Sequence, residues 1–227
     1  MQSRHVGGIG DFGKFALLRH LMSGRQLAVC FCLSGADGEV RARTRHFDYL
    51  GQPDKFRHLA PDLFDKLAEF AASRATSPDP LFALRASGVL PDAIFVRHKV
   101  PRQTSLRPAW TELLVNSVSG ADLVYLDPES GIQGNRLTNR HVALAEIAAL
   151  RLKNRVLIIG HHQSGRKAEV KYLADQVKSL GFDLVEIIRL RLVASHLFVI
   201  LDQDETMSEA TATFVRRWGD WVRSYRF

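Results

Sequence analysis

The sequence predicts an α/β fold with a mostly parallel sheet, an antiparallel hairpin near the C-terminus and a helical insertion. Short apolar runs that read as buried strands alternate with longer segments of helical periodicity. The apolar runs at 184–190 and 195–201 are joined too closely for a helical crossover. These two strands must therefore be antiparallel neighbours.

The first part of the chain holds one clear helix and one clear strand. Apolar residues at helical spacing predict a helix over 12–22, which Gly24 ends. A compact apolar run predicts a strand over 27–33. Residues 39–92 begin as a polar, basic stretch and then show helical periodicity over 62–73. We expect this segment to be an insertion or helical subdomain within a single domain that spans residues 1–227.

From residue 93 onward, strands and helices alternate regularly. The predicted strands are 93–96, 123–127, 155–160, 184–190 and 195–201. The predicted helices are 108–117, 138–152, 167–180 and a last helix that holds Phe214, Trp218 and Trp221. Such alternation is typical of a mainly parallel sheet.

Charge and composition limit the partners and the location of the protein. The net charge of +7 and a pI near 9.7 favour a polyanionic partner, most simply RNA or DNA. Cys30 and Cys32 alternate along one strand, so we expect core thiols and neither a disulfide nor a zinc site. No apolar run approaches the ~18 residues that a membrane span needs, and residues 1–5 lack a signal region. We expect a cytoplasmic protein that has no contact with the membrane.

The segment 121–131 reads as a buried strand that runs directly into a carboxylate, a proline and a turn. In open α/β sheets, ligands bind outside the carboxyl ends of the strands. Asp127 and Glu129 should therefore line a pocket. In the alternative interpretation, Asp127 caps the next helix and Pro128 only ends the strand.

The glycine-rich start of the chain is a first candidate for a ligand-binding segment. Residues 8–13 match the dinucleotide pattern G-x-G-x-x-G, but no strand precedes them, which argues against a nicotinamide or flavin site. Gly10 permits close backbone approach, Asp11 can cap the helix and Lys14 offers a cation. Alternatively, this segment is a glycine-rich lead-in with a solvated lysine.

Two further loops should open on the same edge of the sheet. Ser34 and Gly35 follow the first strand and form the better candidate for a cofactor loop, although Asp-Gly in this region also suits an ordinary turn. After the strand 155–160, His161 or His162 could bind substrate or act as a base, and Arg166 could contact a phosphate. The alternative for these three residues is a solvated, capping loop.

Several segments resemble those of bacterial ribosomal RNA adenine-N6 methyltransferases, which belong to the Rossmann-like S-adenosylmethionine-dependent methyltransferase superfamily. Residues 10–18 (Gly-Asp-Phe-Gly-Lys-Phe-Ala-Leu-Leu) are similar to the N-terminal segment of that family. Residues 46–50 stand where the family has an aromatic-leucine segment, and Leu126-Asp127-Pro128 matches the start of its Asp-Pro-Pro-Tyr motif. A terminal hairpin is also a feature of that fold. The sequence is still more similar to bacterial proteins of uncharacterised function with Gly-Asp-x-x-Lys-Tyr and Leu-Asp-Pro-Asp-Asn-Gly motifs.

The resemblance implies that the fold binds S-adenosylmethionine and that the substrate is a flipped or single-stranded base. Asp127 would orient the nucleophile, with Glu129 as the candidate base. The residues implied to lie near the cofactor or the target base are Gly10, Lys14, Ser34, Gly35 and Asp127. The sequence departs from the family at two places: Glu129-Ser130 replace a proline and a stacking aromatic, and residues 30–35 lack the usual acidic residue.

Two other functions are compatible with the same residues. The first is a metal-dependent nuclease or phosphoesterase, in which Asp127, Glu129 and His161 or His162 would hold Mg²⁺ or Mn²⁺. The second is a catalytically silent module that binds nucleic acid or a protein partner. Salt-sensitive binding without turnover would be its signature.

Overall fold

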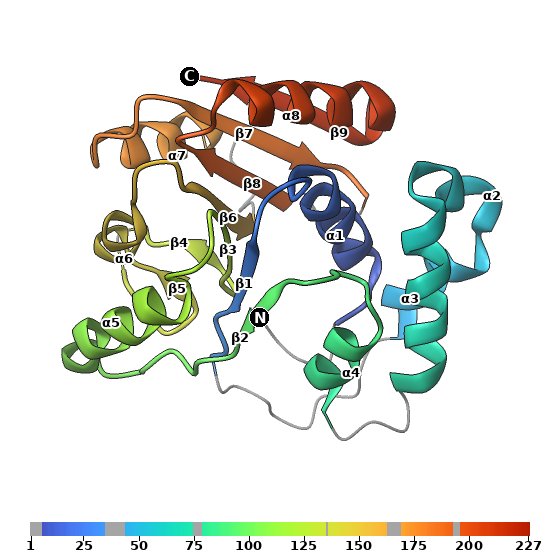
Figure 1. The fold of residues 1–227 in the computed structure, drawn as a ribbon, viewed down its shortest axis with the longest axis horizontal. Helices are drawn as coiled ribbons and strands as arrows, with labels where there is room; N and C mark the ends of the chain where they lie inside the picture. The colour runs from blue at the N-terminus through green and yellow to red at the C-terminus, as the bar shows by residue number, and fades with distance from the viewer. Residues whose placement is uncertain (1–5, 35–43, 75–78, 135, 163–168, 193–195) are drawn as a thin grey trace.

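The computed structural model describes residues 6–34, 44–74, 79–134, 136–162, 169–192 and 196–227. Its centre is a seven-stranded sheet with the order β2-β1-β3-β6-β8-β7-β9 (Figure 1). The strands of this sheet are β1 (Leu27–Phe31), β2 (Ile94–Val96), β3 (Leu123–Asp127), β6 (Val156–His162), β7 (Val185–Leu190), β8 (His196–Leu201) and β9 (Val222–Arg226). A separate two-stranded parallel sheet pairs β4 (Gly131–Ile132) with β5 (His141–Val142).

The strand directions confirm an α/β fold with a mostly parallel sheet. β2, β1, β3 and β6 run parallel to one another. β8 lies between β6 and β7 and is antiparallel to both, which confirms the predicted hairpin. β9 adds a further antiparallel strand beside β7. β1 and β3 are buried along their whole length, which explains their continuous apolar sequences.

Helices cover both faces of the sheet (Figure 1). One face is covered by α1 (Ile9–Leu21), α3 (Pro61–Arg74), α4 (Pro80–Ala86) and α8 (Glu205–Trp218). The other is covered by α5 (Arg107–Ser117), α6 (Leu144–Leu150) and α7 (Glu169–Lys178). The short helix α2 (Pro53–Phe56) and the 3-10 helices η2 (Thr44–Gly51), η3 (Arg57–Leu59), η4 (Thr104–Leu106) and η5 (Gly219–Trp221) complete the described elements. Each face has its own apolar core.

The segment predicted as an insertion is helical where the structure describes it. Its elements η2, α2, η3, α3 and α4 contribute side chains to the same core as α1. Tyr49 stacks on Phe12 of α1 with ring centroids 5.5 Å apart, and Phe64 meets Phe12 edge to face at 6.0 Å. The segment and the sheet therefore share one hydrophobic cluster.

Several predicted boundaries were wrong, each for a local reason. The helix predicted over 138–152 begins only at Leu144, because β5 precedes it. β6 continues to His162, so the two histidines lie on a strand and not in a loop. Trp221 lies in η5, after the end of α8. The following strand, β9, has the sequence Val-Arg-Ser-Tyr-Arg, which lacks the apolar run on which strand prediction depends.

The start of the first helix also differs from the prediction. α1 begins at Ile9 with Gly8 as its N-cap, and Asp11 lies inside the first turn, where its side chain accepts a hydrogen bond from the backbone N–H of Gly7 at 2.8 Å. Cys30 and Cys32 are buried free thiols, as predicted. In the described part of the chain, no helix is long and apolar enough to cross a membrane.

Candidate functional site

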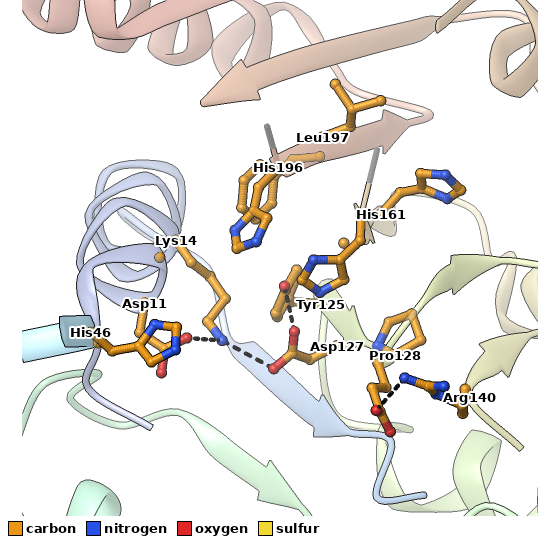
Figure 2. Close-up of a pocket in the computed structure, with 16 residues that line it drawn as sticks. Asp11, Lys14, His46, Tyr125, Asp127, Pro128, Arg140, His161, His196 and Leu197 are labelled. Atoms are coloured by element: carbon orange, nitrogen blue, oxygen red, sulfur yellow. Dashed lines mark hydrogen bonds and ion pairs between the residues drawn. The ribbon is translucent and has the colours of Figure 1, made fainter. Parts of the chain in front are cut away.

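A cavity of about 340 Å³ opens at the carboxyl ends of β3 and β6, beside the first turns of α1 (Figure 2). Its walls come from α1, β3, β6, β8 and the segment after β3. Asp127 is the last residue of β3 and Pro128 follows it. Because the cavity lies at this end of the strand, both residues line it. The helix that follows, α6, has Ala143 as its N-cap, so Asp127 does not cap it.

A buried lysine joins two carboxylates at the floor of the cavity (Figure 2). Nζ of Lys14 lies 2.5 Å from Oδ1 of Asp11 and donates a hydrogen bond of 3.0 Å to Oδ2 of Asp127. The Lys14 side chain is only 6% exposed. The hydroxyl of Tyr125 donates to the other oxygen of Asp127, Oδ1, at 2.9 Å. The carboxylate of Asp127 is therefore held from both sides.

The pKa values of Asp11, Lys14 and Asp127 are shifted from their ordinary values in different directions. For Asp127, burial is the largest single effect and favours a higher pKa, but nearby positive charge, chiefly Lys14, and the hydrogen bonds from Lys14 and Tyr125 together outweigh it, so the pKa is lowered. For Asp11, burial is the larger effect and raises the pKa, although Lys14 offsets part of it. Burial opposes the charge of Lys14, but the two carboxylates raise its pKa overall. Asp127 thus stays ionised at neutral pH, and Asp11 is the more basic carboxylate.

Two glycines leave space for rings in the cavity wall. A Cβ atom on Gly160 would lie 2.6 Å from the hydroxyl oxygen of Tyr125. A Cβ atom on Gly10 would lie 2.8 Å from Cε1 of His196. Glycine at these positions allows both rings to approach the backbone, and it allows Tyr125 to reach Asp127.

His162 and His196 form a pair across the antiparallel strands β6 and β8. Their ring centroids are 4.4 Å apart and the rings are nearly perpendicular. Burial lowers the pKa of both imidazoles, to about 3 for His196, where the neighbouring His162 also contributes. Both rings are therefore uncharged at neutral pH and present proton-accepting nitrogens.

His161 points to the opposite face of β6, because side chains alternate along a strand. Its Nδ1 accepts a hydrogen bond of 3.1 Å from the backbone N–H of Ile132, so the neutral ring carries its proton on Nε2. That Nε2 lies 3.4 Å from Oε1 of Glu169. Both ring nitrogens are engaged, and His161 fixes β4 against β6.

Gly131 makes this contact possible, so its replacement should be costly. In Gly131→Ala, the new Cβ would lie 2.3 Å from Nδ1 of His161, and the backbone has a φ of +112°, which disfavours any side chain. We expect a loss of about 2 kcal/mol in the free energy of unfolding, measured by urea denaturation. Gly134→Ala is the matched control, because a Cβ there meets no atom within 4 Å. Equal stability of the two variants would contradict this interpretation.

Glu129 links three segments at the rim of the cavity. Ser34 Oγ donates to Oε2 of Glu129 at 2.5 Å, and Nη2 of Arg140 donates to Oε1 at 2.7 Å. The side chain of Asn139 donates to the backbone carbonyl oxygen of Ser34 at 2.6 Å. These hydrogen bonds connect the segment after β1, the segment after β3 and residues 139–140. Both oxygens of Glu129 are occupied in this arrangement.

The structure brings most of the predicted site residues together. Those that line the cavity are Gly10, Lys14, Asp127, Glu129, His161 and His162. Ser34 reaches the site through its hydrogen bond to Glu129. Gly35 and Arg166 lie outside the residues that the structure describes, so the roles predicted for them stay predictions.

Sequence reasoning missed three contributors and misread a fourth. Tyr125 carried a usable signal, because a residue two positions before Asp127 on a strand shares its face. Asp11 stands three residues before Lys14, a spacing that favours an ion pair on a helix, whereas its predicted role is only that of a helix cap. Arg140 and His196 carried no local signal, since their positions depend on the fold.

For the alternative function of a metal-dependent nuclease or phosphoesterase, the described part of the chain offers no set of metal ligands. There, no group of three or more His, Cys, Asp or Glu side chains could hold a metal ion. The ammonium of Lys14 lies between Asp11 and Asp127 and supplies the positive charge that these carboxylates need.

No protein-family model matches this sequence, and neither does any curated protein. The functional assignment therefore depends on the cavity itself. Its chemistry combines an ionised carboxylate, a phenol and two uncharged imidazoles at the carboxyl edge of a mostly parallel sheet.

Proposed function

We propose that this protein is an S-adenosylmethionine-dependent methyltransferase that modifies an amino nitrogen of a nucleic acid base. The observation that carries the proposal is Asp127, an ionised hydrogen-bond acceptor at the end of β3, beside uncharged imidazoles. The placement of β8 antiparallel between β6 and β7 supports it further, because such a terminal hairpin is a feature of the Rossmann-like methyltransferase fold.

The charge of the cavity wall fits the proposed cofactor. Among the cavity-lining residues that the structure describes, three carboxylates, Asp11, Asp127 and Glu129, face two cations, Lys14 and Arg140, while the lowered pKa values of His162 and His196 keep both imidazoles uncharged. With all three carboxylates ionised, these side chains carry one more negative than positive charge, which favours a sulfonium cation over an anion. Bound S-adenosylmethionine would supply an electrophilic methyl group. Ser34, three residues after the end of β1 and hydrogen-bonded to Glu129, would contact it.

In this proposal Asp127 orients the target amine and His162 accepts its proton. The N–H of the amine donates to Asp127, which directs the nitrogen lone pair toward the methyl group. Methyl transfer to this amine would leave positive charge on its nitrogen, which the carboxylate of Asp127 would stabilise. The amine proton then passes to His162 and from there to water. Asp127 is a weak proton acceptor because its pKa is lowered, and Glu129 serves to hold the rim.

Calorimetric titration with S-adenosylmethionine and S-adenosylhomocysteine tests the proposal. We expect micromolar binding of both, with the sulfonium form preferred, because only that form is attracted by the net negative wall. Asp127→Asn should remove the preference by eliminating one carboxylate charge. The control is Asp175→Asn, an exposed carboxylate on α7. Absence of binding at millimolar concentrations of both compounds would refute the assignment.

A further inference from the structure

A second cavity, of about 250 Å³, lies where α1 packs beside α3 and α8 (Figure 1). Two helices each present three side chains at the spacing i, i+3, i+4 to this cavity: Ala16, Arg19 and His20 from α1, and Phe214, Arg217 and Trp218 from α8. Residues 59–63, at the start of α3, form the third wall. None of the described residues that line this cavity also lines the cavity at the ends of β3 and β6, so the two are separate sites.

The guanidinium group of Arg19 uses little of its capacity to donate hydrogen bonds. Its Nη2 donates to Oδ2 of Asp62 at 2.5 Å. Its Nη1 is buried and has no hydrogen-bond partner among the residues that the structure describes. Buried polar groups are normally hydrogen-bonded, so the unpaired nitrogen indicates that this guanidinium is placed to bind a further acceptor. The Arg19 side chain is 26% exposed and lines the second cavity, where such an acceptor would enter.

Asp62 is a weak competitor for Arg19. Its side chain is 66% exposed, and the contact uses one guanidinium nitrogen, not the bidentate geometry in which both oxygens of a carboxylate are held. Exposed ion pairs of this kind contribute little, because water screens them. An anion that enters the cavity can therefore displace Asp62 from Arg19.

Arg217 supplies a second guanidinium group to the same cavity. It is exposed and forms no ion pair with any residue that the structure describes. Asp62 is the only carboxylate among the described lining residues. Two guanidinium groups thus share one carboxylate, and this excess of positive charge favours an anion.

We propose that the second cavity binds the phosphate group of a small organic phosphate between Arg19 and Arg217. The planar guanidinium group matches the oxygens of a phosphate in geometry, and a phosphate monoester carries nearly two negative charges at neutral pH, one for each arginine. The apolar side chains of residues 59, 61 and 63 would contact the organic part of the ligand. The proposal is independent of the proposed methyltransferase function, because the two cavities share no described lining residue.

Calorimetric titration of the full chain with phenyl phosphate, inorganic phosphate and benzoate tests the proposal, in buffer of low ionic strength because salt screens such contacts. We expect phenyl phosphate to bind with a Kd of about 1 mM or lower, and the other two anions to bind more weakly. Arg217→Gln should weaken phenyl phosphate binding about fivefold, since one charge-assisted contact is lost. Asp62→Asn should strengthen it about threefold, because the competing carboxylate is removed.

The matched control is Arg216→Gln, which removes the same charge from the neighbouring position of α8, where the side chain donates to Thr213 and does not line the cavity. Arg140→Gln removes a cation from the cavity at the ends of β3 and β6. Both variants should bind phenyl phosphate like the unmodified protein.

Each other outcome overturns the proposal or a stated part of it. No binding of either phosphate at millimolar concentrations would refute the site. An equal loss in Arg216→Gln and Arg217→Gln would show that only net charge matters, and a loss in Arg140→Gln would place the ligand in the other cavity. Unchanged or weaker binding by Asp62→Asn would contradict the competition for Arg19. Benzoate binding as tightly as phenyl phosphate would refute the selection of phosphate, and inorganic phosphate doing so would refute the contact with an organic part.

Discussion

Replacing Lys14 with methionine should lower the free energy of unfolding by about 3 kcal/mol at pH 8, because removal of one partner leaves buried charge without compensation. Methionine fills a similar volume, so the loss is electrostatic. The carboxylates of Asp11 and Asp127 would then face each other without the ammonium that lies between them. Urea denaturation of both proteins at pH 8 measures the difference.

The loss in free energy of unfolding caused by Lys14→Met should become smaller as the pH falls toward 5. Without Lys14, burial and mutual repulsion raise the pKa of Asp11 and Asp127 above their values in the unfolded chain, so the folded variant takes up protons as the pH falls. In the unmodified protein, the pKa of Asp127 is lowered from its ordinary value of 3.8. Asp127 therefore contributes stability at pH values above 3.8, and this contribution is lost only as the pH falls below that value. Repeating the urea denaturation at pH 5 gives the comparison.

Lys171→Met is the control for this experiment. Lys171 is 73% exposed and pairs with Asp175 on the surface of α7, so its replacement should cost less than about 1 kcal/mol. If Lys14→Met were as stable as Lys171→Met at pH 8, the buried cluster would not have the energetic role assigned to it.

His196 should make the folded protein sensitive to acid well before its carboxylates titrate. Its pKa is lowered to about 3 by burial and by His162. In the unfolded chain His196 therefore takes up a proton near pH 6.5, whereas in the folded chain it does so only near pH 3. Stability should therefore fall as the pH decreases from 6.5 toward 3, by up to about 1.4 kcal/mol per pH unit for one proton. Partial exposure of the ring will reduce this slope.

Denaturation at pH 7 and at pH 4.5 measures the effect, and His196→Gln should show a smaller loss over this interval than the unmodified protein. His58→Gln, which replaces an exposed histidine of η3, is the matched control substitution. If His196→Gln kept the full slope, the imidazole pair would not resist protonation.

The central strand and its carboxylate were predictable because the signal is local. The run from Leu123 to Asp127 is continuously apolar and ends at Pro128, which fixes both the strand and its carboxyl end. The partner of Asp127 was not predictable in the same way. Lys14 is 113 residues away, and only the packing of α1 on the sheet brings the two together.

The remaining errors also have physical causes. Gly10 favours a loop by propensity, yet it lies within α1, where a helix permits the His196 ring to approach. β9 is an edge strand with Arg223 and Arg226 among its five residues, so its sequence resembles a surface loop. His161 and His162 follow an apolar run and looked like the start of a loop, but pairing with β8 keeps them in the strand.

The close contacts between glycines and rings bear on how this sequence can change during evolution. A Cβ at position 160 would collide with the hydroxyl oxygen of Tyr125, and one at position 10 would collide with the ring of His196. Each pair of positions should therefore vary together among relatives. A relative with alanine at position 160 should carry phenylalanine at position 125 and so lose a hydrogen-bond donor to Asp127. Such coupled substitutions would separate relatives that keep the same chemistry from those that keep only the fold.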